Sequence, residues 1–141
     1  SNEVYRLLRA LIRIRRACPA LRSPEDEPAV KRCTQPCPDE ATQLAYWKLN
    51  GGQAHLVVLT FEAAPSSTES KFVMPASAEY PIGEVFVDLL NPERHAFITV
   101  DGGEKLLLVP RQSVEASHAA IFAPKADLVS DDGGGWMICA G

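Results

Sequence analysis

The side chains with the most reactive chemistry in this chain of 141 residues are its four cysteines, Cys18, Cys33, Cys37 and Cys139. Three residues separate Cys33 from Cys37, a spacing that fits neither a CxxC redox motif nor a zinc knuckle. Four cysteines allow three pairings, and we expect one disulfide in this region, with Cys33–Cys37 as the local option. Such a bond implies an oxidising compartment and favours an extracellular location.

The three histidines, His55, His95 and His118, stand alone in the sequence. They show no HxH or HExxH pattern and no cysteine at a matching spacing, so we predict no metal site in this chain. Ser113 and Ser117 lie close to His118, but no GxSxG motif surrounds them. A hydrolase triad is therefore not expected.

Aromatic rings offer a different chemistry, because the apolar C–H faces of sugars stack on flat amphipathic rings. Tyr46 and Trp47 are adjacent in an extended segment, so their side chains point to opposite faces of a strand. One of the two must face outward or towards a partner, and the other fits a packed core. Tyr80 and Trp136 are expected in a loop and in the tail. Trp47, Tyr80 and Trp136 are therefore candidate carbohydrate-binding residues.

The first element that must position these residues is an amphipathic helix over Asn2–Ala17. Its apolar residues recur every three or four positions, which is the period of one helical face, and arginines fill the opposite side. Pro19 ends the helix, because a proline pushes the preceding residue out of the α region. We predict that the apolar face packs against protein through Leu7, Leu8, Leu11 and Ile14.

The rest of the chain has the signals of an all-β unit. Residues 19–40 contain five prolines and many charges, which predicts an irregular connector. From residue 43 the hydrophobic period changes to two, and turn signals such as Asn50-Gly51-Gly52 and Asp101-Gly102-Gly103 separate short strands. The expected strands are Gln43–Leu49, Ala54–Phe61, Lys71–Met74, Gly83–Leu90, His95–Val100, Lys105–Val109 and Val114–Phe122. They predict an antiparallel β-sandwich, followed by a last edge strand at Trp136–Cys139.

Composition and charge narrow the classes of function. The chain is 46% hydrophobic and 23% charged, as is usual for soluble globular domains, and no apolar run is long enough for a membrane span. The net charge of −4 makes a nucleic-acid partner unexpected. Residues 1–32 hold eight basic and four acidic side chains, whereas the remainder is acidic. This asymmetry indicates structural units of different origin.

The segment LLRALIRIRRACPALR, residues 7–22, resembles the last barrel helix of α-amylase family glycoside hydrolases, including its Pro-Ala-Leu-Arg exit. The later segments AYWKLN, HLVVLTF, EVFVDLLNPE and KLLLVPRQSVEASHAAIFAP are similar, in order and spacing, to the C-terminal β-sandwich of that family, called domain C. The resemblance spans residues 3–124. It divides the chain into a barrel helix (1–22), a connector (23–42), a sandwich (43–124) and a glycine-rich tail (125–141).

The resemblance implies a non-catalytic domain of an enzyme that hydrolyses or transfers α-glucans. Catalysis in that family needs two carboxyls about 5–5.5 Å apart, held on barrel strands that precede this segment. The local carboxylates, Asp88, Glu84, Glu79 and Glu93, are expected near strand ends and turns, facing water. No catalytic residue and no cofactor are implied here, and Ca²⁺ is implied only for the parent enzyme.

The partner implied by the resemblance is the catalytic barrel, or in its place a second copy of the chain; an α-glucan ligand is a further candidate. Two alternative functions stay open on the sequence alone. One is a free-standing carbohydrate-binding sandwich, and the other is a protein-interaction module that uses the arginine-rich helix.

Overall fold

The computed structural model describes residues 2–33, 43–60, 69–110, 118–131 and 135–140. Helix α1 (Asn2–Ala17) confirms the predicted helix at both ends. A further helical turn, α2 (Pro19–Arg22), follows directly, because proline is well accepted in the first turn of a helix. No helix in the described part of the chain is long and apolar enough to cross a membrane.

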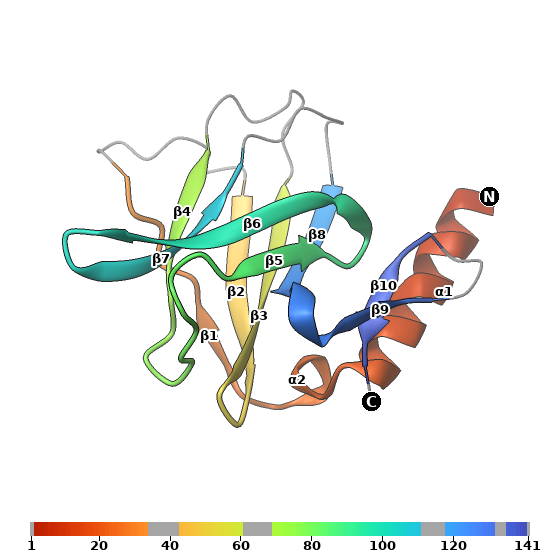
Figure 1. Ribbon diagram of the computed structural model, residues 1–141. Helices are drawn as coiled ribbons and strands as arrows, with labels where there is room; N and C mark the ends of the chain where they lie inside the picture. The colour runs from red at the N-terminus through yellow and green to blue at the C-terminus, as the bar shows by residue number, and fades with distance from the viewer. Residues whose placement is uncertain (1, 34–42, 61–68, 111–117, 132–134, 141) are drawn as a thin grey trace.

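The predicted mainly-β fold, an N-terminal helix followed by an antiparallel sandwich-like sheet, is confirmed. Eight strands form one curled antiparallel sheet in the order β1-β2-β3-β8-β5-β6-β7-β4, so that β5 and β6 cross in front of β2 and β3 (Figure 1). The strands are β1 (Asp26–Pro28), β2 (Gln43–Asn50), β3 (Gln53–Thr60), β4 (Ser70–Val73), β5 (Val85–Asp88), β6 (Asn91–Asp101), β7 (Glu104–Val109) and β8 (His118–Pro124).

The connector is the first place where the structure differs from the prediction. Asp26–Pro28 is not irregular but pairs with β2 as strand β1. A proline is tolerated there because β1 is an edge strand, and an edge strand need not donate every backbone N–H. Both predicted hairpins are confirmed, and positive φ angles of 55° at Gly51 and 95° at Gly52 show why glycine is required in the first.

The tail also differs from the prediction. The strand expected at Trp136–Cys139 is present as β10 (Met137–Cys139), but it does not join the main sheet: it pairs with β9 (Leu128–Ser130) in a separate two-stranded sheet. A short 3₁₀ turn, η1 (Lys125–Asp127), follows β8 and leads the chain away from the main sheet. The β9–β10 pair then lies against α1, which brings both chain ends to the same side of the molecule (Figure 1).

Strand β3 separates two hydrophobic cores. The inner core fills the curl of the sheet and includes Leu56, Val58 and Phe122. The outer core lies between β3, β8, α1 and the tail, and it includes Ile14 and Val57. Successive β3 side chains enter different cores, because they alternate across the sheet. The predicted central position of this strand, apolar on both faces, is therefore confirmed.

Candidate functional site

Helix α1 meets the rest of the chain with only part of its apolar face. Ile14 is fully buried and Leu11 is half-buried, but Leu7 and Leu8 are exposed. The prediction that this face packs against protein is therefore confirmed for Ile14. Leu7 and Leu8 are not covered by this chain's own sheet, and their packing against a barrel or a second copy stays a prediction. The reason is geometric, since the outer core gathers around Ala10 and Ile14 and ends below the first turns of α1.

A stripe of exposed apolar residues runs along α1. Val4, Leu8 and Ile12, here called the exposed helix stripe, are 57%, 54% and 53% exposed. Their four-residue spacing places them one above the other on one helical face. An apolar stripe of this kind facing water is typical of a surface that contacts a partner.

An apolar groove, the helix–sheet groove, lies beside this stripe. It has a volume of about 620 Å³ and separates α1 and α2 from the outer face of β2, β3 and β8. Its apolar lining is formed by Leu11, Ile14, Leu21, Tyr46, Val57, Leu59, Ala119 and Ile121. Arg15, Asp26 and Lys48 add charge to the lining. Leu8 and Leu11 are neighbours at three-residue spacing, so the stripe and the groove are continuous.

A charged contact holds the other side of α1 to the tail. Arg13 Nε donates to Asp131 Oδ2 at 2.9 Å, and Trp136 Nε1 donates to the same oxygen at 2.9 Å. Arg13 Nη2 donates to the second carboxylate oxygen. The hydrogen bonds from Arg13 hold the pKa of Asp131 below its usual value. Helix α1 is therefore anchored by its arginine side, while its stripe stays uncovered.

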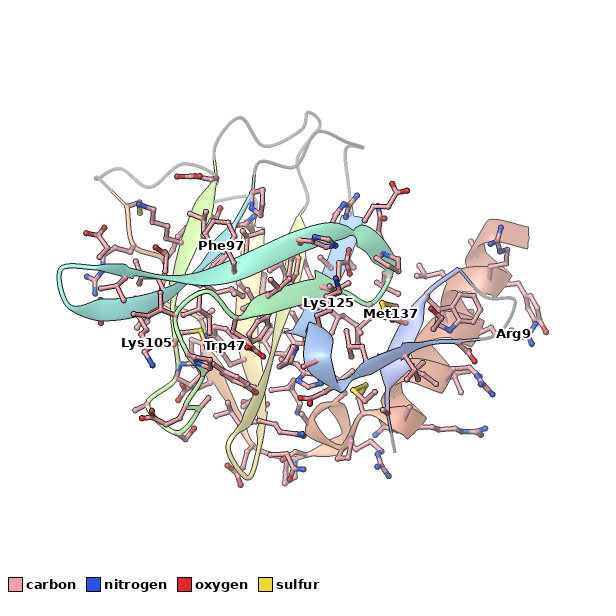
Figure 2. The ribbon with its side chains drawn as sticks, viewed as in Figure 1. Arg9, Trp47, Phe97, Lys105, Lys125 and Met137 are labelled. Carbon is pink, nitrogen blue, oxygen red and sulfur yellow. A yellow bond between two sulfur atoms is a disulfide. The ribbon has the colours of Figure 1, made fainter. Side chains whose placement is uncertain are left out.

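The structure does not form the aromatic platform that we predicted for sugars. Trp47 is 1% exposed in the inner core and donates its Nε1–H to the Val73 carbonyl at 3.2 Å (Figure 2). Trp136 is also buried, against α1. The carbohydrate-binding role is therefore wrong for both tryptophans, and Trp47 takes the core alternative.

Tyr80, the third member of that platform, is half-buried. Its hydroxyl accepts a hydrogen bond from the Ala54 N–H at 3.1 Å, and its ring packs edge-on against Phe86. Both contacts tie the side chain to the inner core rather than present a flat face to solvent. Burial raises the pKa of the Tyr80 hydroxyl.

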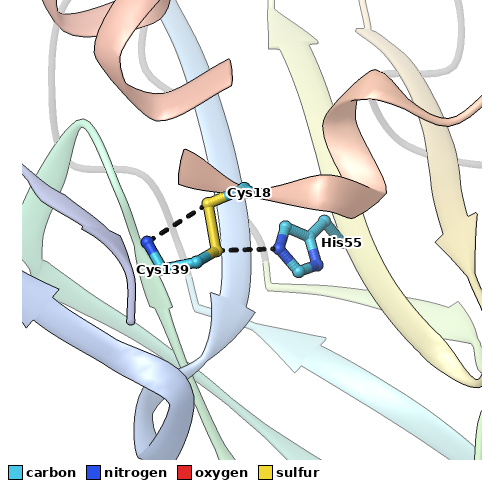
Figure 3. Close-up of side chains that lie close together, drawn as sticks. All are labelled: Cys18, His55 and Cys139. Atoms are coloured by element: carbon cyan, nitrogen blue, oxygen red, sulfur yellow. Dashed lines mark hydrogen bonds between the residues drawn. A yellow bond between two sulfur atoms is a disulfide. The ribbon is translucent and has the colours of Figure 1, made fainter. Parts of the chain in front are cut away.

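The cysteine pairing seen in the structure joins the helix to the tail. Cys18, directly after α1, forms a disulfide with Cys139 in β10, across 121 positions of sequence (Figure 3). Cys33 is also disulfide-bonded. Cys37 lies outside the described residues, so the Cys33–Cys37 bond stays a prediction. The Cys18–Cys139 disulfide favours an oxidising compartment.

His55 lies against this disulfide, a contact that the sequence analysis missed. Its side chain is 3% exposed, and its Nε2 lies 3.4 Å from Cys139 Sγ (Figure 3). Burial lowers the pKa of His55, so the imidazole is neutral at neutral pH. No spacing motif could have revealed the cluster, because its three members come from β3 and the two ends of the chain. His95 is exposed, and the side chain of His118 lies outside the described residues.

Asp88 corrects our expectation that the carboxylates of this chain face water. It is fully buried where β5 ends at a β-bulge, and its Oδ1 accepts the backbone N–H groups of Leu90 and Ile121, both at 3.0 Å. Arg94 Nη1 lies 3.5 Å from Oδ2. Burial raises the pKa of Asp88 to about 6. Its partners are backbone amides and an arginine rather than a second carboxylate, so Asp88 holds β5, β6 and β8 together.

Replacing Asp88 with asparagine is expected to change the pH dependence of stability. The folded-state pKa of about 6 lies above the ordinary aspartate value of 3.8, so ionisation of Asp88 destabilises the folded chain as the pH rises through this interval. The variant cannot ionise. Its free energy of unfolding, relative to the natural chain, is therefore expected to rise by about 2 kcal/mol between pH 4 and pH 7.

Chemical denaturation at the two pH values measures this change, and the exposed Glu93→Gln variant is the control. If the free energy of unfolding changes with pH in both variants as it does in the natural chain, ionisation of Asp88 does not affect stability and the prediction is wrong.

The exposed helix stripe and the helix–sheet groove together form a continuous apolar surface. In the part of the chain that the structure describes, this surface is the best candidate for contact with a partner. Comparison with known proteins finds no family model, no curated protein and no solved structure that matches this chain. The surface contains no pair of carboxylates, and its shape and composition suit the docking of another apolar surface.

Proposed function

We propose that this chain is the non-catalytic C-terminal part of an α-amylase-like glycoside hydrolase or transglycosylase acting on α-glucans, and that it stabilises the catalytic barrel. The observation that carries the proposal is the uncovered apolar surface formed by the exposed helix stripe and the helix–sheet groove. The outer helices of an α/β barrel must bury one apolar face against the barrel strands. Helix α1 has such a face and covers only part of it with its own sheet.

Two further observations support this proposal. The order of elements, a helix, the Pro19–Arg22 turn and then an antiparallel sheet, is the order that the resemblance to the family implies. The arginine side of α1 points away from the sheet, as Arg9 shows in Figure 2, while the apolar side is turned towards the groove. In this proposal the parent enzyme is extracellular, and the Ca²⁺ and the α-glucan belong to its barrel.

The size of the stripe is sufficient to matter for docking. Val4, Leu8 and Ile12 are each about half exposed. Covering the exposed parts of three such side chains contributes on the order of 3 kcal/mol, and apolar contacts in the groove add to this. A barrel surface that covers the stripe would therefore stabilise both partners.

The proposal and its alternatives differ in how they use this apolar surface. A second copy of the chain could cover the stripe, and this would appear as a dimer in the absence of a barrel. A free-standing carbohydrate module is not favoured, because Trp47 and Trp136 are buried. An interaction module based on the arginines would bind through the opposite side of α1 and would not depend on the stripe.

The first test is the coding sequence upstream of residue 1. The proposal requires roughly 300–400 further residues that end in barrel strands, given the size of such barrels with insertions. An upstream sequence that encodes a different kind of domain would contradict it.

The second test mixes the purified chain with that upstream barrel, produced separately. We expect no reducing-sugar release from starch, maltodextrin or an aryl α-glucoside by the chain alone. The chain is expected to raise the melting temperature and the activity of the barrel. Leu8→Asp should weaken this effect about tenfold or more, because it places a charge in the apolar contact. The matched control is Ile82→Asp, since Ile82 is an exposed apolar residue away from α1.

Either of two results would overturn the proposal. One is turnover by the chain alone that disappears on mutation of Asp88 or Glu84. The other is a barrel that responds equally to the Leu8→Asp and Ile82→Asp variants.

A further inference from the structure

Three side chains that are distant in the sequence meet between α1, β3 and β10. The Sγ atoms of Cys18 and Cys139 and an imidazole nitrogen of His55 all lie within 4.8 Å of one another (Figure 3). We propose that, when the Cys18–Cys139 bond is reduced, these three residues bind one Zn²⁺ ion, with water as the fourth ligand. Two thiolates and one imidazole are ligands that zinc prefers in proteins.

The positions of the three side chains are close to those of a tetrahedral zinc site. Such a site separates a nitrogen and a sulfur ligand by about 3.6 Å and two sulfur ligands by about 3.8 Å, from the usual zinc–ligand distances. His55 Nε2 is already 3.4 Å from Cys139 Sγ. The two sulfur atoms must move apart, and rotation about their Cα–Cβ bonds allows this while the Cα atoms stay 5.1 Å apart.

The surroundings of the cluster also suit a metal–thiolate centre. The backbone N–H of Cys139 donates to Cys18 Sγ at 3.3 Å, and a hydrogen bond of this kind stabilises a thiolate that binds a metal. His55 is almost completely buried, and its Nδ1 has no hydrogen-bond partner in the described part of the chain. A buried imidazole directed at sulfur, with its other nitrogen unpaired, is unusual in a core, and coordination through Nε2 gives it a role.

The proposed chemistry balances in two steps. A thiol or phosphine reductant supplies two electrons that break the S–S bond, and each sulfur atom takes up a proton. Zinc then replaces both thiol protons, so that one Zn²⁺ and two thiols give a neutral bis-thiolate centre and two released protons. Zinc and the disulfide are therefore alternative links between the end of α1 and β10.

The test uses the full chain with Cys33→Ser and Cys37→Ser, which removes the other two thiols. The protein is reduced with a phosphine, freed of reductant without air, and titrated with Zn²⁺ in competition with a chromophoric chelator. We expect one equivalent of zinc per chain, and none for the oxidised protein. Adding Cys139→Ser should weaken binding by roughly 100-fold and adding His55→Gln by roughly tenfold, because each removes a ligand. The control is His95→Gln, in which an exposed histidine is changed.

A second readout does not depend on the folding of these variants. Cobalt(II) replaces zinc in the same protein, and intense visible absorption with a sulfur-to-cobalt charge-transfer band is expected for a tetrahedral site with two thiolates. Three results would overturn the proposal: binding of less than about half an equivalent by the reduced protein, a weak octahedral cobalt spectrum, or equal zinc affinity in the His55→Gln and His95→Gln variants.

Discussion

Replacing Cys139 with serine is expected to lower the free energy of unfolding by about 4–5 kcal/mol, because the lost disulfide closes a very long loop. The bond joins positions separated by 121 residues, so it removes more conformational freedom from the unfolded chain than a local bond would. It is also the covalent link between α1 and the tail. Guanidinium denaturation followed by circular dichroism measures the loss.

The matched control for this prediction is the natural chain in the presence of a reductant and a metal chelator. When the variant is measured under the same conditions, the Cys18–Cys139 bond is absent from both proteins and any other disulfide is reduced in both. The two are then expected to unfold at nearly the same denaturant concentration. A loss below about 1 kcal/mol without reductant would show that the bond constrains the unfolded chain far less than the loop model requires.

Replacing Val57 with aspartate is expected to cost more than about 3 kcal/mol, because it places an uncompensated charge in the outer core. Val57 lies in β3 between Tyr46 of β2 and Ile121 of β8, and it is buried against α1. Leu44→Asp is the matched control, since Leu44 lies on the neighbouring strand and is 52% exposed. Thermal unfolding of both variants measures the difference, and melting temperatures within a degree or two of each other would show that β3 is not central.

Much of the secondary structure could be predicted from local sequence signals. The helix over Asn2–Ala17 follows from its hydrophobic period, and Pro19 marks its end. The hairpin at Gly51 and Gly52 follows from the need for positive φ angles. These elements depend on interactions between residues close in sequence, so a single chain reveals them. Strand β1 could not be predicted in this way, because Asp26–Pro28 becomes a strand only through its pairing with β2.

The candidate site was predicted less well than the fold. The sequence correctly identified α1 as a helix with an apolar face, and that face carries the proposed docking surface. The sequence does not show which apolar residues of the helix the sheet covers. Leu7 and Leu8 were expected to pack against protein, but within this chain they are exposed. The same limit applies to Trp47. Alternation along a strand shows that Tyr46 and Trp47 point to opposite faces, but it does not show which of the two enters the core.

By itself, the sequence determined the class of fold, the central position of β3 and the amphipathic character of α1, because hydrophobic period and turn residues act over a few positions. Only the tertiary structure decided which distant groups meet: the burial of Asp88, the pairing of Cys18 with Cys139 and the contact of His55 with that pair. Each depends on how β3, β8, α1 and the tail pack together. Packing brings together residues that are far apart in the sequence, and no sequence period or motif marks such pairs. The candidate metal site of Cys18, His55 and Cys139 was therefore recognised only in the three-dimensional structure.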